Sequence, residues 1–169
     1  MDRQQALAII HEFVKNTNLV RHMLAVEAAM LDYAEYFSED PGPWGLAGLL
    51  HDFDWEIHPT LVYHPQAGAS ILRERGVPEE IIRTVLSHAE HTGVPRVTRM
   101  DHALFACDEV TGLITAVALI RPSRSLHDLT AQSVKKKWKD ARFAAAVNRD
   151  EIARGAAEIG VELWEHVDR

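Results

Sequence analysis

A histidine followed by an aspartate, His51 and Asp52, ends the apolar run at residues 45–50. Imidazole nitrogens and carboxylate oxygens are ligands for divalent metal ions. Side chains of adjacent helical residues point about 100° apart, yet two neighbours at a helix end can reach one ion, or one aspartate can bridge two. The dipeptide alone is common, so its interpretation as the centre of a metal site depends on ligands elsewhere in the chain.

Two further polar residues interrupt helical faces that are otherwise apolar. His22 lies within the stripe of Leu19, Val26 and Ala29, and Asp108 has only uncharged residues three and four positions away. A buried carboxylate without a partner is costly, so Asp108 requires either a metal ion or an arginine or histidine partner. For His22, the alternative to metal ligation is a hydrogen-bonded position in the core.

These residues carry a resemblance to a known family. The segments Arg21-His22, Ala47-Gly48-Leu49-Leu50-His51-Asp52 and Ala106-Cys107-Asp108 resemble the H…HD…D signature of the HD-domain superfamily, and of its HDIG-type metal-dependent phosphohydrolases. The resemblance covers about residues 18–125. It implies that His22, His51, Asp52 and Asp108 bind one divalent metal ion within a bundle of helices. We expect residues 1–169 to form a single HD domain, with a core at about 18–125 and C-terminal helices at 126–169.

The resemblance also implies a second metal position. The segment His64-Pro65-Gln66-Ala67-Gly68 is similar to the HP-x-x-G segment of two-metal HD proteins, and His88 lies where those proteins place a further ligand. Asp52 would then bridge two ions. His91 is an alternative or additional ligand beside His88, and His58 competes with His64. Imidazole and carboxylate ligands without thiolates favour Fe, Mn, Zn, Co or Ni over Mg or Ca, so we expect one or two divalent transition-metal ions.

The candidate substrate-binding residues are arginines. Arg21 adjoins a predicted ligand, and Arg121-Pro122-Ser123-Arg124 resembles the RP-x-R segment of the HD-GYP branch, so Arg21, Arg121 and Arg124 are candidate phosphate contacts. A cyclic dinucleotide substrate, which that branch hydrolyses, is disfavoured. The stretch matching its HDIGK segment lacks the lysine, and Thr92-Gly93-Val94-Pro95 does not preserve its GYP triplet. The basic residues 135–139 are either a solvated helical face or a guide for phosphate.

Three functions are compatible with this pattern. The leading one is hydrolysis of a small phosphorylated compound or nucleotide, as a phosphomonoesterase or phosphodiesterase, by a metal-activated water at His51 and Asp52. Asp54, Glu56 and His91 are candidate acids or bases. The alternatives are a mixed-valent di-iron oxygenase of the same superfamily, whose ligand types match, and a non-catalytic nucleotide-binding regulator. The oxygenase branch tends to have a lysine just after the second-metal histidine, and its absence at residues 89–92 favours hydrolysis.

Composition limits the remaining possibilities. A length of 169 residues suits one domain, and the formal charge of −7 argues against a nucleic-acid partner. The only cysteine, Cys107, excludes an intramolecular disulfide. No signal peptide is evident, and the longest apolar candidate, at residues 113–120, is interpreted as a buried helix rather than a membrane span. We therefore expect a cytoplasmic protein with a small phosphorylated substrate or nucleotide as its partner, and the oligomeric state stays open.

The elements that would hold these residues are all helical. Apolar spacing and capping residues predict helices at about 2–15, from Asn18 onwards, at 44–50, at 65–75 ended by Gly76, from Pro78 onwards, at 99–120, at 127–138 and at 149–167. Thr98 and Asp101 have capping-box spacing for the long helix, which Pro122 ends. Because strand-like alternation is nearly absent, we predict the all-α class and an HD-type helical bundle around the metal site.

Overall fold

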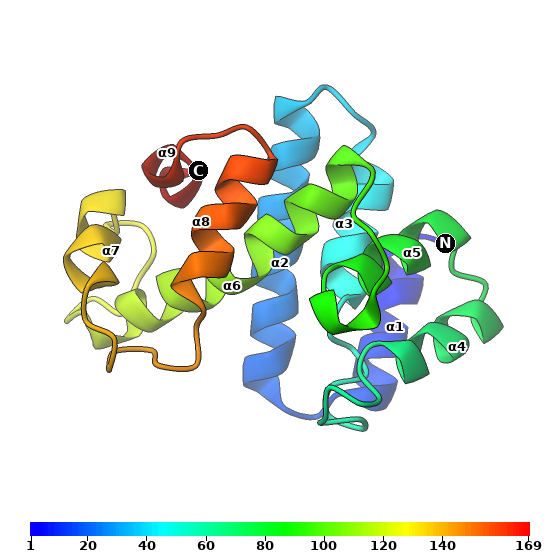
Figure 1. The fold of residues 1–169 in the computed structure, drawn as a ribbon. Helices are drawn as coiled ribbons and strands as arrows, with labels where there is room; N and C mark the ends of the chain where they lie inside the picture. Colours follow the sequence, from blue (N-terminus) through cyan, green and yellow to red (C-terminus); the bar gives the residue numbers. More distant parts are fainter. The chain divides into compact units, whose positions relative to one another are not determined.

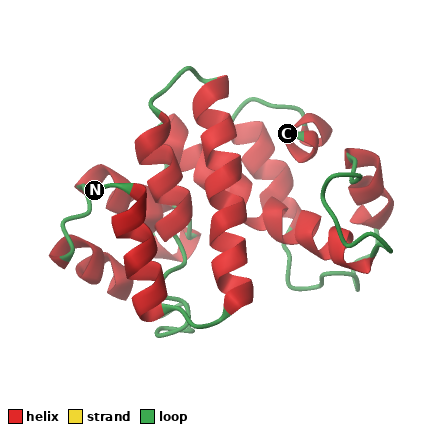
Figure 2. Ribbon diagram, turned by 180° about the vertical axis from the view of Figure 1, so that it is seen from behind, coloured by secondary structure: helices red, strands yellow, loops and turns green.

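The computed structural model describes residues 1–169, and it consists of helices and the loops that join them (Figure 1, Figure 2). The all-α prediction is confirmed. The helices are α1 Arg3–Phe13, α2 Thr17–Tyr36, α3 Pro41–Leu50, α4 Gln66–Glu74, α5 Glu79–Ser87, α6 Arg99–Ile120, α7 Ala131–Trp138, α8 Arg149–Glu158 and α9 Leu163–Asp168, with a 3-10 helix η1 at Glu90–Thr92. Contacts divide the chain into two compact units, Met1–Phe105 and Ala106–Arg169.

The starts of two helices differ from the prediction. Asn16, not Asn18, caps α2, because its side chain accepts a hydrogen bond from the Asn18 backbone N–H. α3 begins at Pro41 rather than residue 44, after Asp40 as its cap. The predicted start at residue 44 left Pro41 and Pro43 outside the helix, but a proline in the first helical turn has no N–H to satisfy and its φ already suits a helix.

Other predicted helix ends are confirmed. Gly76 follows α4 with φ of 72°, and its N–H donates to the carbonyl of Arg73. At the start of α6, the Asp101 N–H donates to Thr98 Oγ1, and the Thr98 N–H donates to the Asp101 carboxylate. This reciprocal pair is the predicted capping box, and α6 has the predicted bounds.

Within the unit Met1–Phe105, the most extensive helix contact joins α2 to α3 (blue and cyan in Figure 1). Every residue of α3 from Trp44 to Leu50 is buried. A Cβ atom added at Gly48 would lie 2.9 Å from Glu27 Cα, so only glycine allows this approach of the two backbones. α3 also contacts α1 and α5, and α4 packs on α5. The buried end of α3 therefore places His51 and Asp52 among several helices.

The unit Ala106–Arg169 has its own apolar core. Its buried residues are Val110, Leu113, Val117, Val134, Ile152 and Val167. The helix predicted at 149–167 is wrong, because Gly160 adopts φ of 77° and separates α8 from α9. The helix predicted at 127–138 begins only at Ala131. Before it, the Arg121 guanidinium donates to the carbonyl and carboxylate of Asp128, which stabilises a turn.

One helix, α6, has the length and apolar composition that a membrane span would need. From the sequence, only residues 113–120 were weighed as an apolar candidate, and they were interpreted as a buried helix rather than a membrane span. In the structure, 56% of the most apolar window of α6 is buried. Core helices of soluble proteins meet the same criteria, so this single helix is weak evidence for a membrane span.

Candidate metal centre

The carboxylate of Asp52 lies between two pairs of histidine rings. Its Oδ2 atom is 3.7 Å from His22 Nε2 and 3.6 Å from His51 Nε2. Its Oδ1 atom is 3.3 Å from His64 Nε2 and 3.8 Å from His88 Nε2. The two oxygens of one carboxylate therefore face two separate groups of imidazole nitrogens. Asp52 comes directly after His51, which is the C-cap of α3, while His22 lies within α2 and His88 is the C-cap of α5.

The opposite ring nitrogen of three histidines is held by an acceptor. His51 Nδ1 donates to the Gly48 carbonyl at 2.8 Å, and His88 Nδ1 donates to the Val85 carbonyl. His64 Nδ1 donates to Asp54 Oδ1 at 2.8 Å. An imidazole whose Nδ1 carries the proton presents its Nε2 lone pair as the metal ligand. The rings are thus oriented before any ion binds.

His22 approaches the same centre from α2. Its Nε2 lies 3.3 Å from His51 Nε2, and the two rings meet edge to face with centroids 5.1 Å apart. The His22 side chain is 24% exposed, whereas that of His51 is fully buried. His22 therefore lies at the more solvent-accessible side of this histidine pair.

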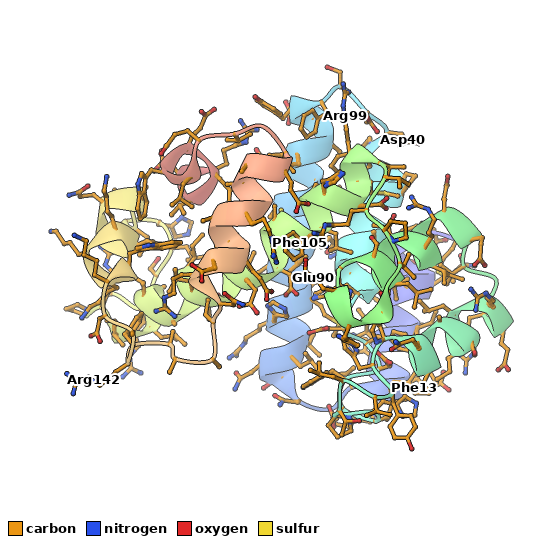
Figure 3. The ribbon with its side chains drawn as sticks, in the orientation of Figure 1. Phe13, Asp40, Glu90, Arg99, Phe105 and Arg142 are labelled. Atoms are coloured by element: carbon orange, nitrogen blue, oxygen red, sulfur yellow. The ribbon has the colours of Figure 1, made fainter.

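Asp54 is fully buried and faces His64. Its Oδ2 accepts a hydrogen bond from the Gly68 N–H at 3.1 Å, and its Oδ1 accepts from His64. Phe53, between the two aspartates, packs against the ring of Phe13, which is labelled in Figure 3. This contact anchors the segment that carries Asp52 and Asp54.

The electrostatics of this pocket favour a cation. Burial lowers the pKa of His64, but hydrogen bonds and charges from Asp52 and Asp54 outweigh burial and raise that pKa to about 9. In the absence of a metal ion, the two carboxylates thus favour a proton on His64. A metal ion at the same position would experience the same attraction.

The ligand atoms around Asp52 lie close to the spacing that one ion requires, although three of the four separations are slightly longer. Nitrogen and oxygen ligands lie about 2.0–2.2 Å from an ion such as Zn²⁺, so two ligands of one ion lie roughly 3–3.5 Å apart. The separations around Asp52 are 3.3–3.8 Å. The ligand atoms of Asp52, His64 and His88 all lie within 4.8 Å of one another. Imidazole and carboxylate donors at these distances fit a divalent transition metal, and these residues could hold one.

The other predicted site residues lie in varied surroundings. Asp108 is half-buried in the middle of α6, in the unit Ala106–Arg169. His91 Nε2–H donates to the His64 carbonyl at 2.7 Å, so it supports the His64 backbone. Arg21 is exposed on α2, Arg121 is paired with Asp128, and Arg124 is exposed in a turn with φ of 46°.

Two candidate acids or bases, Glu56 and Asp54, already accept hydrogen bonds from the protein. The Glu56 carboxylate accepts hydrogen bonds from the backbone N–H groups of Lys15 and Asn16, and Asp54 is bound as described. Asp54 was predicted as a candidate acid or base, and its hydrogen bond with His64 was not predicted. The sequence carries no local signal for this contact, because Asp54 and His64 meet only in the folded chain.

Comparison with known proteins supplies one match. A family model described as HD domain matches residues 19–113, which is more than half of the chain and includes all six predicted ligand positions. No curated protein and no solved structure matches this chain.

Proposed function

The chain belongs to the HD-domain family, and from this premise we propose that it is a metal-dependent phosphohydrolase acting on a small phosphorylated compound or nucleotide. The observation that carries the proposal is the Asp52 carboxylate, whose two oxygens face separate histidine pairs. In this proposal Asp52 would contribute a ligand to each of two divalent ions. His22, His51 and Asp108 complete the first ligand set, with Asp108 assigned from the family signature. His64 and His88 complete the second.

The bound ions would supply activation of a water molecule and neutralisation of charge on the phosphoryl oxygens. The protein's own contribution is positional. Gly48, Val85 and Asp54 fix the Nδ1–H tautomers of His51, His88 and His64, so that each Nε2 faces Asp52. Such fixed donors and acceptors need no reorganisation during the reaction.

In the overall hydrolysis, a water oxygen forms the new bond to phosphorus, the ester P–O bond breaks, and the leaving oxygen gains a proton. We assign Arg21 as the first candidate for contact with the substrate phosphate, because it is exposed beside His22. Arg121 would first have to leave Asp128, so its contact with phosphate is less favourable. Asp54 and His91 are engaged in hydrogen bonds with His64, which favours positioning roles for them. Glu56 accepts hydrogen bonds only from the backbone of Lys15 and Asn16 and contacts no proposed ligand.

The test begins with elemental analysis of the protein purified without added metal, followed by a phosphatase and nucleotidase panel. We expect about one to two transition-metal ions per chain and hydrolysis of at least one phosphate ester. Asp52→Asn replaces one of the two facing oxygens by an amide nitrogen, so it should lose metal and activity together. Asp108→Asn should weaken the binding of only one of the two ions. The control is Asp150→Asn, an exposed residue in the first turn of α8.

Three outcomes would contradict the proposal. Tightly held iron together with oxygen consumption would indicate the oxygenase chemistry known in the superfamily. Nucleotide binding without turnover would indicate a regulator. Absence of metal, with Asp52→Asn behaving like Asp150→Asn, would show that the histidines around Asp52 are structural.

A further inference from the structure

Asp54 is a buried carboxylate whose surroundings contain no arginine or lysine partner. Its relative exposure is 0%, and its only ionisable hydrogen-bond partner is His64. Burying a carboxylate is costly unless it is paired and hydrogen-bonded. A chain that needed only to fill this position would be more stable with an apolar or amide side chain. The charge of Asp54 therefore serves His64.

The start of α4 holds Asp54 in place. The N-cap of α4, Pro65, makes no side-chain capping hydrogen bond, and the N–H of Gly68 in the first turn donates to Asp54 Oδ2 instead. A carboxylate at this end is also favoured by the helix dipole. A Cβ atom at Gly68 would lie 2.6 Å from Asp54 Cγ, so a glycine at this position is what lets the carboxylate approach the start of α4 so closely. One oxygen is thus fixed by the helix and the other is directed at His64.

The three oriented histidines differ in the partner of Nδ1. His51 and His88 donate to neutral backbone carbonyls, whereas His64 donates to a carboxylate. A carboxylate partner makes an imidazole more basic and a stronger metal ligand than a carbonyl partner does. Together, Asp52 and Asp54 also bring two negative charges to the group of His64 and His88. Of the three oriented histidines, only His64 is therefore held by a charged acceptor.

We propose that Asp54 is a positioning residue that fixes the Nε2 of His64 as a ligand and makes the Asp52, His64 and His88 group bind its ion more tightly than a carbonyl-held histidine would. This inference rests on the proposed metal-dependent function, and it concerns which of the two positions keeps its ion. Asp54 acts through His64 and does not contact the substrate.

The experiment is a calorimetric titration of the full chain with Zn²⁺ after removal of metal by a chelator. For the wild type we expect two binding steps. Asp54→Asn keeps the shape of the side chain but removes its charge, and its single amide oxygen cannot accept from both the Gly68 N–H and the His64 N–H. One of the two Zn²⁺-binding steps should therefore weaken by about 10- to 100-fold while the other is unchanged. The matched control is Glu56→Gln, two residues later, whose carboxylate binds only backbone N–H groups of Lys15 and Asn16.

A second measurement needs no variant. In the Zn²⁺-loaded wild type with ¹⁵N-labelled histidine, long-range ¹H–¹⁵N correlation spectra should show His64 with its proton on Nδ1. The inference is overturned if His64 carries its proton on Nε2, or if Asp54→Asn binds both ions like the wild type. It is also overturned if both binding steps and the thermal midpoint fall together, since that indicates a structural role. A wild type that binds no Zn²⁺ would instead refute the proposed function itself.

Discussion

The approach of α2 to α3 at Gly48 sets the distance between two proposed ligands, and its loss should be measurable. A Cβ atom at Gly48 would lie 2.9 Å from Glu27 Cα and 3.0 Å from the Glu27 backbone nitrogen. Backbone atoms cannot rotate away, so Gly48→Ala must move α2 away from α3. Restoring an ordinary contact of 3.4 Å requires a shift of about 0.5 Å.

This shift has a stability cost and a metal-binding cost. Overpacking a core costs about 1–3 kcal/mol, and exchanging glycine for alanine inside a helix returns up to about 1 kcal/mol. We therefore expect Gly48→Ala to lower the free energy of unfolding by up to about 2 kcal/mol. His22 on α2 lies 3.3 Å from His51 at the end of α3. Misplacement by about 1 Å can lower a reaction rate 10²-fold. By the same scale, half that shift should lower the affinity for one metal ion by roughly tenfold.

The assay is urea unfolding followed by circular dichroism, together with Zn²⁺ titration. Gly112→Ala in α6 is the matched control, because its Cβ would meet only Val147 Cγ2 at an ordinary 3.7 Å. That variant should be about 0.5–1 kcal/mol more stable than the wild type. If Gly48→Ala is as stable as Gly112→Ala and binds both ions normally, the reasoning from close helix approach is wrong.

The remaining predictions concern pH. Burial raises the pKa of Asp101, but hydrogen bonds from Arg83, Thr84 and two backbone N–H groups outweigh it and hold that pKa below its usual range. Its stabilisation is present above about pH 4 and is lost as pH falls through the lowered pKa, so Asp101→Asn should cost about 2–3 kcal/mol at pH 7 and progressively less as pH falls below about 4 in urea unfolding. Burial lowers the pKa of His166, whose Nε2–H donates to the Ala106 carbonyl. Its contribution is present above about pH 6.5 and is lost as the ring protonates at lower pH. His166→Gln should therefore flatten the pH dependence of thermal stability below about pH 6.5, and an unchanged slope would refute this.

The helices with strong local signals could be predicted from the sequence, and the failures have local causes. α6 was predicted within its bounds because its apolar run and its Thr98–Asp101 capping box agree. The start of α3 was missed because two prolines read as a break, although a first turn accepts them. The final helix was predicted as continuous because its apolar spacing extends through Gly160, which in the structure adopts a left-handed conformation.

The ligand types of the site could be predicted, but their supports could not. The residue types and order of His22, His51, Asp52, His64 and His88 are visible in the sequence, and the structure brings their side chains together within one unit. Which acceptor holds each Nδ1 depends on tertiary contacts, so neither the Asp54–His64 hydrogen bond nor the support of the His64 carbonyl by His91 could be deduced. The requirement for glycine at position 48 also could not be deduced, because it arises only from the packing of α2 against α3.

The ends of three helices explain why this centre attracts a cation. The last carbonyls of a helix lack intrahelical partners and carry partial negative charge. His51 and His88 are C-cap residues, and each donates Nδ1–H to the carbonyl three residues earlier, in α3 and α5 respectively. The same hydrogen bond thus satisfies a helix end and orients a ligand. At α4 the polarity is reversed, and Asp54 satisfies the N-terminal N–H while orienting His64. Because two helix C-termini and two carboxylates converge here, the fold itself creates a negative site that a divalent ion would neutralise.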